Sequence, residues 1–308
     1  MAGTHQEKLV APQAGLFRVP GQYSKLWIIY FSVRHPRLIA SNGRVADLKL
    51  KGKVEADRFV NGKPAYICKT LADLFSRPSG GRQRQLVFGD NVLIYEKYSE
   101  MSFVQSQKDS YVGYISNSAL CEKPISFTHY VIAPICHLYE EPNIKAREVM
   151  TLTMGAKIVG TTAKNGFTQT LEGWIKTNMI RKQGEWLKDP ISVAEQLLNT
   201  PYLWGGNSAM GIDCSGLIQL SCHLCGLTCP ADSDMQGDNL GYSLKEYVPL
   251  QRGDLIFWKG HVAWVSTPEM IIHANAFHMA TVKEDLDNAI ERIKVQGGGT
   301  PLSYKRLL

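Results

Sequence analysis

Residues 211–219 read Gly-Ile-Asp-Cys-Ser-Gly-Leu-Ile-Gln, and the apolar positions that follow recur at helical spacing as far as Cys225. Gly226 and Pro230 then predict the end of this helix. Cys214 is therefore expected in the first helical turn, where unpaired backbone N–H groups and the helix dipole favour an anion. Because the thiolate is the nucleophilic form of cysteine, this position favours a reactive thiol.

Two histidines follow at strand-like positions. Residues 261–265 and 270–274 are predicted to be neighbouring strands of a hairpin. A hairpin centred near Thr267 places His261 opposite His273, give or take one residue. Directly opposed side chains lie about 5 Å apart on one face of the sheet. One histidine can then act as a base while the other orients it.

Each of these residues also has an ordinary structural explanation. A single buried cysteine is usually a small apolar core residue, and a single histidine on a strand is usually structural. Here Cys214 occurs together with a Tyr-Leu-Trp-Gly-Gly run at residues 202–206 and with two histidines on one face. The combination favours a catalytic site.

These motifs resemble the NlpC/P60 family of bacterial peptidoglycan cysteine peptidases, over about residues 190–308. The resemblance implies a nucleophile, a general base and an orienting histidine, which are Cys214, His261 and His273. It also implies that Tyr202 lies near the oxyanion site and helps the backbone N–H of the nucleophile to polarise the scissile carbonyl. The family cleaves the amide between γ-D-glutamate and the following diamino acid in murein stem peptides.

Three further cysteines could be read as metal ligands together with His223. Cys222 and Cys225 fall on the predicted helix, and Cys229 follows it. No second ligand pair with zinc-like spacing accompanies them. We therefore expect buried cysteines here, and neither a metal nor another cofactor.

The N-terminal half contains an internal repeat of about 64 residues. Leu74-Phe75 recurs as Leu138-Tyr139, and Gly113-Tyr114 recurs as Gly173-Trp174. Gly89-Asp90 recurs in the same way as Gly155-Ala156. Short alternating strands separated by turn residues, present twice, predict two small β-barrels.

The repeat resembles tandem bacterial SH3 (SH3b) domains, at about residues 64–122 and 127–182. The expected fold class is thus α+β, with a papain-like NlpC/P60 catalytic domain at residues 190–308 preceded by two SH3-like β-barrels. Residues 1–63 match no recognised pattern, and their role is open. Residues 183–188 are predicted to be a linker.

Two SH3b domains ahead of such a catalytic domain resemble the subgroup that cleaves short murein peptides with a free amino-terminal L-alanine. In that subgroup the barrel and the catalytic domain close the pocket about two residues before the scissile bond. The resemblance implies substrate-binding residues on both domains, which are Asp213, Ser215, Asp232, Ser233, Asp90 and Tyr111. Taken alone, Asp232 is more often a helix N-cap and Tyr111 more often a core residue. Two positions depart from the family: Ala231 stands in place of an arginine, and Asp90 in place of a glutamate.

Length and composition suit a multidomain globular enzyme. The chain has 308 residues, and its net charge of +6 is spread along the sequence. No basic run or zinc-finger spacing indicates nucleic acid, and no apolar stretch is long enough to span a membrane. Seven cysteines without framework spacing and the lack of a signal-like start favour a reducing, cytoplasmic setting. We therefore expect the recycling of murein peptides, and the sequence leaves the oligomeric state open.

Two other functions remain open at this point. The chain could be a cell-wall-binding SH3b protein with an idle catalytic domain, although the intact Cys-His-His set argues against it. It could also be an acyltransferase or amidase on the same scaffold, since those enzymes share the nucleophile.

Overall fold

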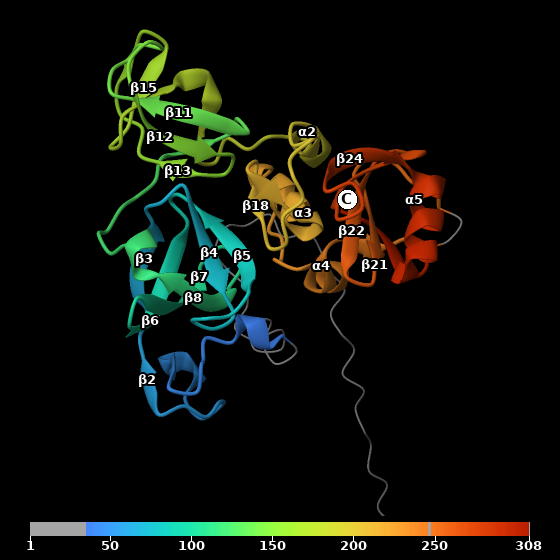
Figure 1. Cartoon of the computed structure of the whole chain (residues 1–308), viewed down its shortest axis with the longest axis horizontal. Helices are drawn as coiled ribbons and strands as arrows, with labels where there is room; N and C mark the ends of the chain where they lie inside the picture. Colours follow the sequence, from blue (N-terminus) through green and yellow to red (C-terminus); the bar gives the residue numbers. More distant parts are fainter. Residues whose placement is uncertain (1–34, 246–247, 308) are drawn as a thin grey trace, which may run out of the picture.

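The computed structural model describes residues 35–245 and 248–307. Figure 1 shows three bodies along the chain: two β-domains and a C-terminal domain that combines a sheet with helices. Among the described residues, no helix combines the length and the apolar character needed to cross a membrane.

The first β-domain is built from one antiparallel sheet. Its strands, in sheet order, are β5 (Arg82–Val87), β4 (Leu71–Phe75), β8 (Val112–Ser116), β7 (Met101–Ser106), β6 (Asn91–Tyr98), β3 (Lys63–Ile67) and β9 (Leu120–Cys121). The short turn η3 (Asn117–Ala119) joins β8 to β9. Alternate strand positions point inwards, and Ile67, Leu74 and Ile115 are fully buried in the core.

The second β-domain repeats this topology in shorter strands. These are β10 (His129–Val131), β11 (Ile135–Tyr139), β12 (Glu148–Thr153), β13 (Lys157–Ile158), β14 (Ala163–Lys164), β15 (Phe167–Gln169), β16 (Trp174–Lys176) and β17 (Ile180–Lys182), with the turn η4 (Thr177–Met179). β10 pairs with β13 and β17, just as β3 pairs with β6 and β9. The long β6 corresponds to two short strands here, β13 and β14, so the sheet divides into two parts.

The register of the two sheets confirms the sequence repeat at single residues. The ladder shifts between Leu74 and Phe75 in the first domain, and between Leu138 and Tyr139 in the second. Phe75 pairs with Tyr114, and Tyr139 pairs with Trp174. The repeated glycines, Gly89 and Gly155, both adopt the left-handed conformation, with φ of 80° and 85°.

The described N-terminal segment extends the first β-domain. It contains η1 (Pro36–Leu38), β1 (Val45–Asp47), η2 (Leu48–Leu50) and β2 (Arg58–Val60), and β1 pairs with β2 in parallel. Val45 packs against Phe103 and Tyr114 of the first domain. The buried carboxylate of Glu96 accepts hydrogen bonds from Arg44 and Arg58. Residues 1–34 lie outside the described part of the chain.

The C-terminal domain has an antiparallel sheet between helices. The sheet order is β20 (Tyr242–Ser243), β25 (Ser303–Arg306), β21 (Asp254–Trp258), β22 (His261–Thr267), β23 (Met270–Asn275) and β24 (Ala280–Asp285). The other elements are α2 (Pro190–Glu195), β18 (Asn207–Ser208), β19 (Gly211–Ile212), α3 (Cys214–Leu224), α4 (Ser233–Asn239), α5 (Leu286–Ile293) and the π-helical turn η5 (Lys294–Gly298). One face of the sheet packs on α3 through Leu217 and Trp264. The other packs on α5 through Ala289 and Ile271, so the sheet lies between the two helices (Figure 1).

The first β-domain packs directly on the catalytic side of the C-terminal domain. Its β5 edge contacts β18 (Figure 1), and Arg82 Nε donates a 2.9 Å hydrogen bond to the Trp204 carbonyl. Gly205 has φ of 71°, and a Cβ there would lie 2.8 Å from the carbonyl oxygen of Gln83. Only glycine fits this close approach of two backbones. The domains therefore meet over the loop that leads to Cys214.

Candidate active site

The start of α3 is held by Asp213, which is its N-cap. Asp213 Oδ1 accepts hydrogen bonds from the Gly216 backbone N–H (2.6 Å) and from Ser215 Oγ (2.9 Å). Its Oδ2 accepts from the Gly205 backbone N–H at 2.9 Å. One carboxylate thus ties the helix start to the loop that packs on the first β-domain, and it places Cys214 at the first helical position.

The thiol of Cys214 is buried, with 7% of the residue exposed. Burial, and then the charge of Asp213, raise the pKa of the thiol to about 12, although the backbone N–H groups of Val262, Ser215 and Cys214 itself act to lower it. The N–H groups at the helix start act to favour the thiolate, as expected, but burial of the thiol outweighs their effect. Cys214 needs a base to become nucleophilic.

The two histidines form a hydrogen-bonded chain that continues to a carboxylate. His261 Nε2 lies 2.9 Å from His273 Nδ1, and His273 Nε2 lies 2.8 Å from Glu284 Oε2. Arg292 on α5 donates two hydrogen bonds to Glu284, at 2.8 and 2.7 Å. The chain therefore crosses β22, β23 and β24 and ends on α5.

The histidines share a face of the sheet, as predicted, but they do not oppose each other directly. Trp264 pairs with Ile272, and this register continues to place His273 two residues out of direct opposition to His261. Thr267 pairs with Met270 and so belongs to the strand, which moves the turn to the next two residues, and the ladder shifts between Val265 and Thr267. The histidines are diagonal neighbours, a relation that long side chains can span.

Both histidines are neutral bases in this environment. Burial, and then the neighbouring His273, lower the pKa of His261 to about 3. Burial also lowers the pKa of His273, against the opposing effect of Glu284. His273 is fully buried. His261 is therefore neutral at any pH near neutrality and keeps a free lone pair that can accept a proton.

Tyr202 lies beside the thiol, where the family resemblance expected it. Its backbone N–H donates to the Met279 carbonyl at 2.9 Å, and the residue forms an isolated bridge with Ile212, two residues before Cys214. Burial, and then the charges of Cys214 and Asp213, raise the pKa of the Tyr202 phenol. The phenol stays protonated, so it can donate a hydrogen bond to a developing oxyanion.

A second polar cluster surrounds Asp232, which precedes α4. Its carboxylate occupies the N-cap position without capping the helix. Instead it accepts a 3.2 Å hydrogen bond from Tyr111 Oη and pairs with Arg37. The cluster thus joins the catalytic domain, the first β-domain and the described N-terminal segment.

Arg84, which the sequence analysis did not single out, lies at the centre of this cluster. It comes from β5 and is 2% exposed, and it donates hydrogen bonds to Gln219 Oε1 (2.8 Å) and Ser215 Oγ (3.3 Å). Its guanidinium also lies 3.8 Å from Asp232 and 4.0 Å from Asp213. Arg84 therefore links the residue next to the nucleophile to the Asp232 cluster. The only signal in the sequence was a cation at an inward position of a strand.

Two residues that were expected to bind the substrate, Asp90 and Ser233, form no hydrogen bond within the described part of the chain with the Asp232 carboxylate or the thiol of Cys214. Asp90 is buried between Lys108 (2.7 Å) and Lys157 (3.2 Å), and its Oδ2 also accepts from the Val87 backbone N–H. The prediction that Asp90 receives a substrate amine is therefore not supported, because two lysines already neutralise its charge. Ser233 begins α4 beside Asp232 and is half-buried. Ala231 is fully buried and packs with the core of the first β-domain.

Three further cysteines lie on or after α3, and the carbonyl of Cys229 accepts a 3.2 Å hydrogen bond from Gln219 Nε2, beside Arg84. Cys222 lies inside α3, Cys225 is its C-cap and Cys229 follows it. Within the described residues, no three His, Cys, Asp or Glu side chains are grouped so that they could hold a metal ion.

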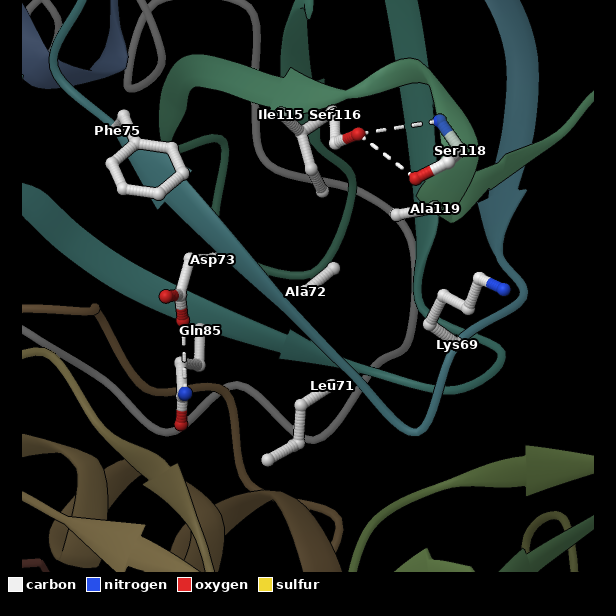
Figure 2. Close-up of a pocket in the computed structure, with 10 residues that line it drawn as sticks. All are labelled: Lys69, Leu71, Ala72, Asp73, Phe75, Gln85, Ile115, Ser116, Ser118 and Ala119. Atoms are coloured by element: carbon white, nitrogen blue, oxygen red, sulfur yellow. Dashed lines mark hydrogen bonds between the residues drawn. The ribbon is translucent and has the colours of Figure 1, made fainter. Parts of the chain in front are cut away.

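A pocket on the first β-domain is separate from the predicted site residues (Figure 2). It is formed by β4, β5, β8 and the turn after β8, and a hydrogen bond between Asp73 and Gln85 spans part of it (2.9 Å). Neither the catalytic histidines nor the Asp232 cluster lines it, so it is no part of the candidate site.

Comparison with known proteins identifies two domains. Residues 199–291 match the NlpC/P60 family, and residues 74–120 match the bacterial dipeptidyl-peptidase SH3 domain. A crystal structure of an NlpC/P60 family protein from Bacillus cereus ATCC 10987 has the same fold, with a TM-score of 0.68 and 20% identity, over 80% of this chain and 99% of that one. The expected α+β fold class, with SH3-like domains before an NlpC/P60 domain, is confirmed.

Two named relatives are similar in sequence over more than half of this chain. Dipeptidyl-peptidase 6 of Lysinibacillus sphaericus is 25% identical over 241 residues, which cover 68% of this chain and 87% of that protein. A Bacillus subtilis (strain 168) protein named gamma-D-glutamyl-L-lysine dipeptidyl-peptidase is 29% identical over 194 residues, which cover 57% and 64% of the two chains.

Proposed function

We propose that this chain, whose residues 199–291 form an NlpC/P60 peptidase domain, is a cysteine peptidase that cleaves the γ-D-glutamyl–diamino acid bond of murein peptides with a free amino-terminal L-alanine. The observations that carry the proposal are the hydrogen-bonded chain from His261 to Glu284 and the contact of the Cys214 thiol with the backbone N–H of Val262, the residue after His261. The names of the two relatives support the substrate class.

The proposed reaction starts from a neutral thiol and a neutral histidine. Cys214 Sγ, which lies next to the backbone N–H of Val262, gives its proton to His261. The thiolate adds to the amide carbonyl carbon, and the oxygen takes the electron pair while Tyr202 Oη and backbone N–H groups stabilise it. When the C–N bond breaks, His261 returns the proton to the leaving amine. Water then hydrolyses the thioester and restores the thiol.

The electrostatics of the Asp232 cluster support recognition of an ammonium group. Four carboxylates, those of Asp109, Asp213, Asp232 and Asp234, surround two guanidinium groups, those of Arg37 and Arg84. Lys108 lies beside Asp109 as a third cation, so the carboxylates exceed the cations by one, and this negative charge favours an ammonium group. Tyr111 from the first β-domain closes over Asp232. The free amino terminus of a bound peptide would therefore lie against Asp232 and Tyr111, with no room for a further residue before it.

Rates for two matched substrates test the proposal. We expect kcat/KM for L-Ala-γ-D-Glu-L-Lys to exceed that of its N-acetylated form by about 100-fold, equivalent to about 3 kcal/mol, since acetylation removes the charge and adds bulk. Asp232→Asn should slow the free peptide and narrow this ratio. Asp234→Asn is the matched control on the exposed side of the same cluster, and it should narrow the ratio less.

The same assay distinguishes the alternatives and the proposed cellular setting. Equal rates on free and acetylated peptides, or ready digestion of intact sacculi, would contradict recycling of released peptides and favour an open wall hydrolase. Binding of murein without turnover would favour an idle SH3b protein. Acyl transfer without hydrolysis would favour the acyltransferase alternative.

A further inference from the structure

We infer that Glu284 and Arg292 are positioning residues that fix the proton positions of the histidine pair, so that His261 Nδ1 is the atom that receives the proton of Cys214. The inference rests on the proposed function for the identity of the base. It goes beyond that function because it adds two residues and assigns a tautomer to each histidine.

The first step is set by the carboxylate of Glu284. An ionised carboxylate only accepts hydrogen bonds. Burial acts to raise the pKa of Glu284, but the hydrogen bonds and charges of His273 and Arg292 outweigh it and lower this pKa to about 2. The 2.8 Å contact between Glu284 Oε2 and His273 Nε2 therefore requires a proton on His273 Nε2. In a neutral imidazole, the lone pair then lies on His273 Nδ1.

The second step follows from the contact between the two rings. His273 Nδ1, now an acceptor, lies 2.9 Å from His261 Nε2. His261 Nε2 must therefore carry a proton and donate it. The lone pair of neutral His261 is left on Nδ1, and Nδ1 is the ring nitrogen that the hydrogen-bonded chain does not use. Without Glu284, the reverse arrangement would be equally available, and it would put the proton on Nδ1 and abolish the base.

Arg292 supplies the third condition, which is that His273 stays neutral. If His273 were protonated on both nitrogens, its Nδ1–H would donate to His261 and reverse the arrangement. The charged and titratable groups that face His273 are His261 on β22, Glu284 on β24, Arg292 on α5 and His278 after β23. Glu284 acts to raise the pKa of His273, while burial, Arg292 and His278 lower it. The two hydrogen bonds from Arg292 balance the charge of Glu284 and keep the carboxylate as a pure acceptor.

The placement of these residues on the sheet makes the arrangement rigid. Val282 pairs with His273, so Glu284 is a diagonal neighbour of His273, just as His273 is of His261. Both contacts are thus the same diagonal step across adjacent strands. Arg292 follows on α5, whose Ala289 is fully buried against the sheet.

The test combines a direct observation with a variant. In the wild-type protein labelled with ¹⁵N-histidine, we expect lone-pair signals at Nδ1 and N–H signals at Nε2 for both His261 and His273, assigned with His261→Gln and His273→Gln. Glu284→Gln should show mixed tautomers and alkylate Cys214 with iodoacetamide about 10- to 100-fold more slowly, as expected when a general base is misplaced. Glu291→Gln, an exposed position of α5, is the matched control and should match wild type.

The outcomes separate this inference from the substrate assignment, since neither the spectra nor the alkylation involves a peptide. A proton on His261 Nδ1 in the wild type would overturn the inference, and this spectrum needs no variant to fold. So would Glu284→Gln with unchanged tautomers and an unchanged alkylation rate. If the inference holds, kcat on any substrate should fall in Glu284→Gln with KM nearly unchanged. Failure of the murein peptide as a substrate would contradict only the proposed function.

Discussion

Burial sets the chemistry of individual residues in this site. Cys214 is kept as a thiol and His261 as a neutral base, because burial of the thiol and partial burial of the imidazole disfavour their charged forms. A thiolate–imidazolium pair can form only when a proton passes directly between them. The thiol is therefore protonated at rest, and an electrophile can react with it only as its proton moves to a base.

One consequence is a dependence of stability on pH. The pKa of His261 is about 3 in the folded protein, against about 6.5 in an unfolded chain. The unfolded state therefore binds the extra proton first, so stability present above about pH 6.5 is lost as the pH falls towards 3. We expect the Tm of the wild type to fall more steeply over this range than that of His261→Gln.

Differential scanning calorimetry between pH 7 and 4 checks this prediction. His137→Gln, at an exposed position on β11, is the control and should follow the wild-type curve. If His261→Gln also runs parallel to the wild type, His261 is not buried as a neutral base.

At the scale of elements, the sequence specified the helix that carries the nucleophile but not the register of the strands that carry the base. The Asp-Cys-Ser-Gly start and Gly226 gave α3 nearly to its ends, because capping signals are local. The predicted pairing of β22 with β23 differs from the observed register by two residues. The register is set by the turn type and by one irregularity in the strand, which the sequence pattern does not specify. Glu284 was missed since β24 was not predicted.

The long-range residues were beyond the reach of sequence patterns. Arg84 is a cation at an inward position of a strand, and its partners Ser215, Gln219 and Asp232 all come from the catalytic domain. Asp90 holds the expected motif position, yet Lys108 of its own domain and Lys157 of the other β-domain neutralise its charge. Both outcomes depend on contacts between domains, which no spacing within one domain contains.

The cap of α3 gives a prediction at this scale. Asp213→Ala removes the acceptor for Gly216 N–H and for Gly205 N–H, so we expect a loss of about 1–2 kcal/mol. It should also lower kcat/KM, because the loop that carries Tyr202 loses its anchor. Thermal unfolding and peptide hydrolysis measure the two effects.

Asp189→Ala is a matched control, since Asp189 caps α2 through Ile191 N–H. It should lower the Tm to a similar degree with activity retained. Full activity in Asp213→Ala would contradict the role of Asp213 in placing the loop and the thiol.

At the scale of the whole molecule, the first β-domain is part of the site. Tyr111 and Arg84 reach Asp232 and Ser215 across the domain boundary, and Arg37 approaches from the N-terminal segment. The two repeated β-domains thus contact the catalytic domain in different ways. The first forms a wall of the site, whereas the second contacts the catalytic domain through Thr153 and the Ala209 backbone N–H. The two β-domains share a topology, and they differ in their contacts with the catalytic domain.

Mass spectrometry of the products from L-Ala-γ-D-Glu-L-Lys tests the central claim most directly. The account predicts that the wild-type protein releases L-Ala-γ-D-Glu and free lysine, and that Cys214→Ala, with an unchanged Tm, releases neither beyond a few per cent of the wild-type rate. Cleavage at a different bond, or turnover retained in Cys214→Ala, would contradict it.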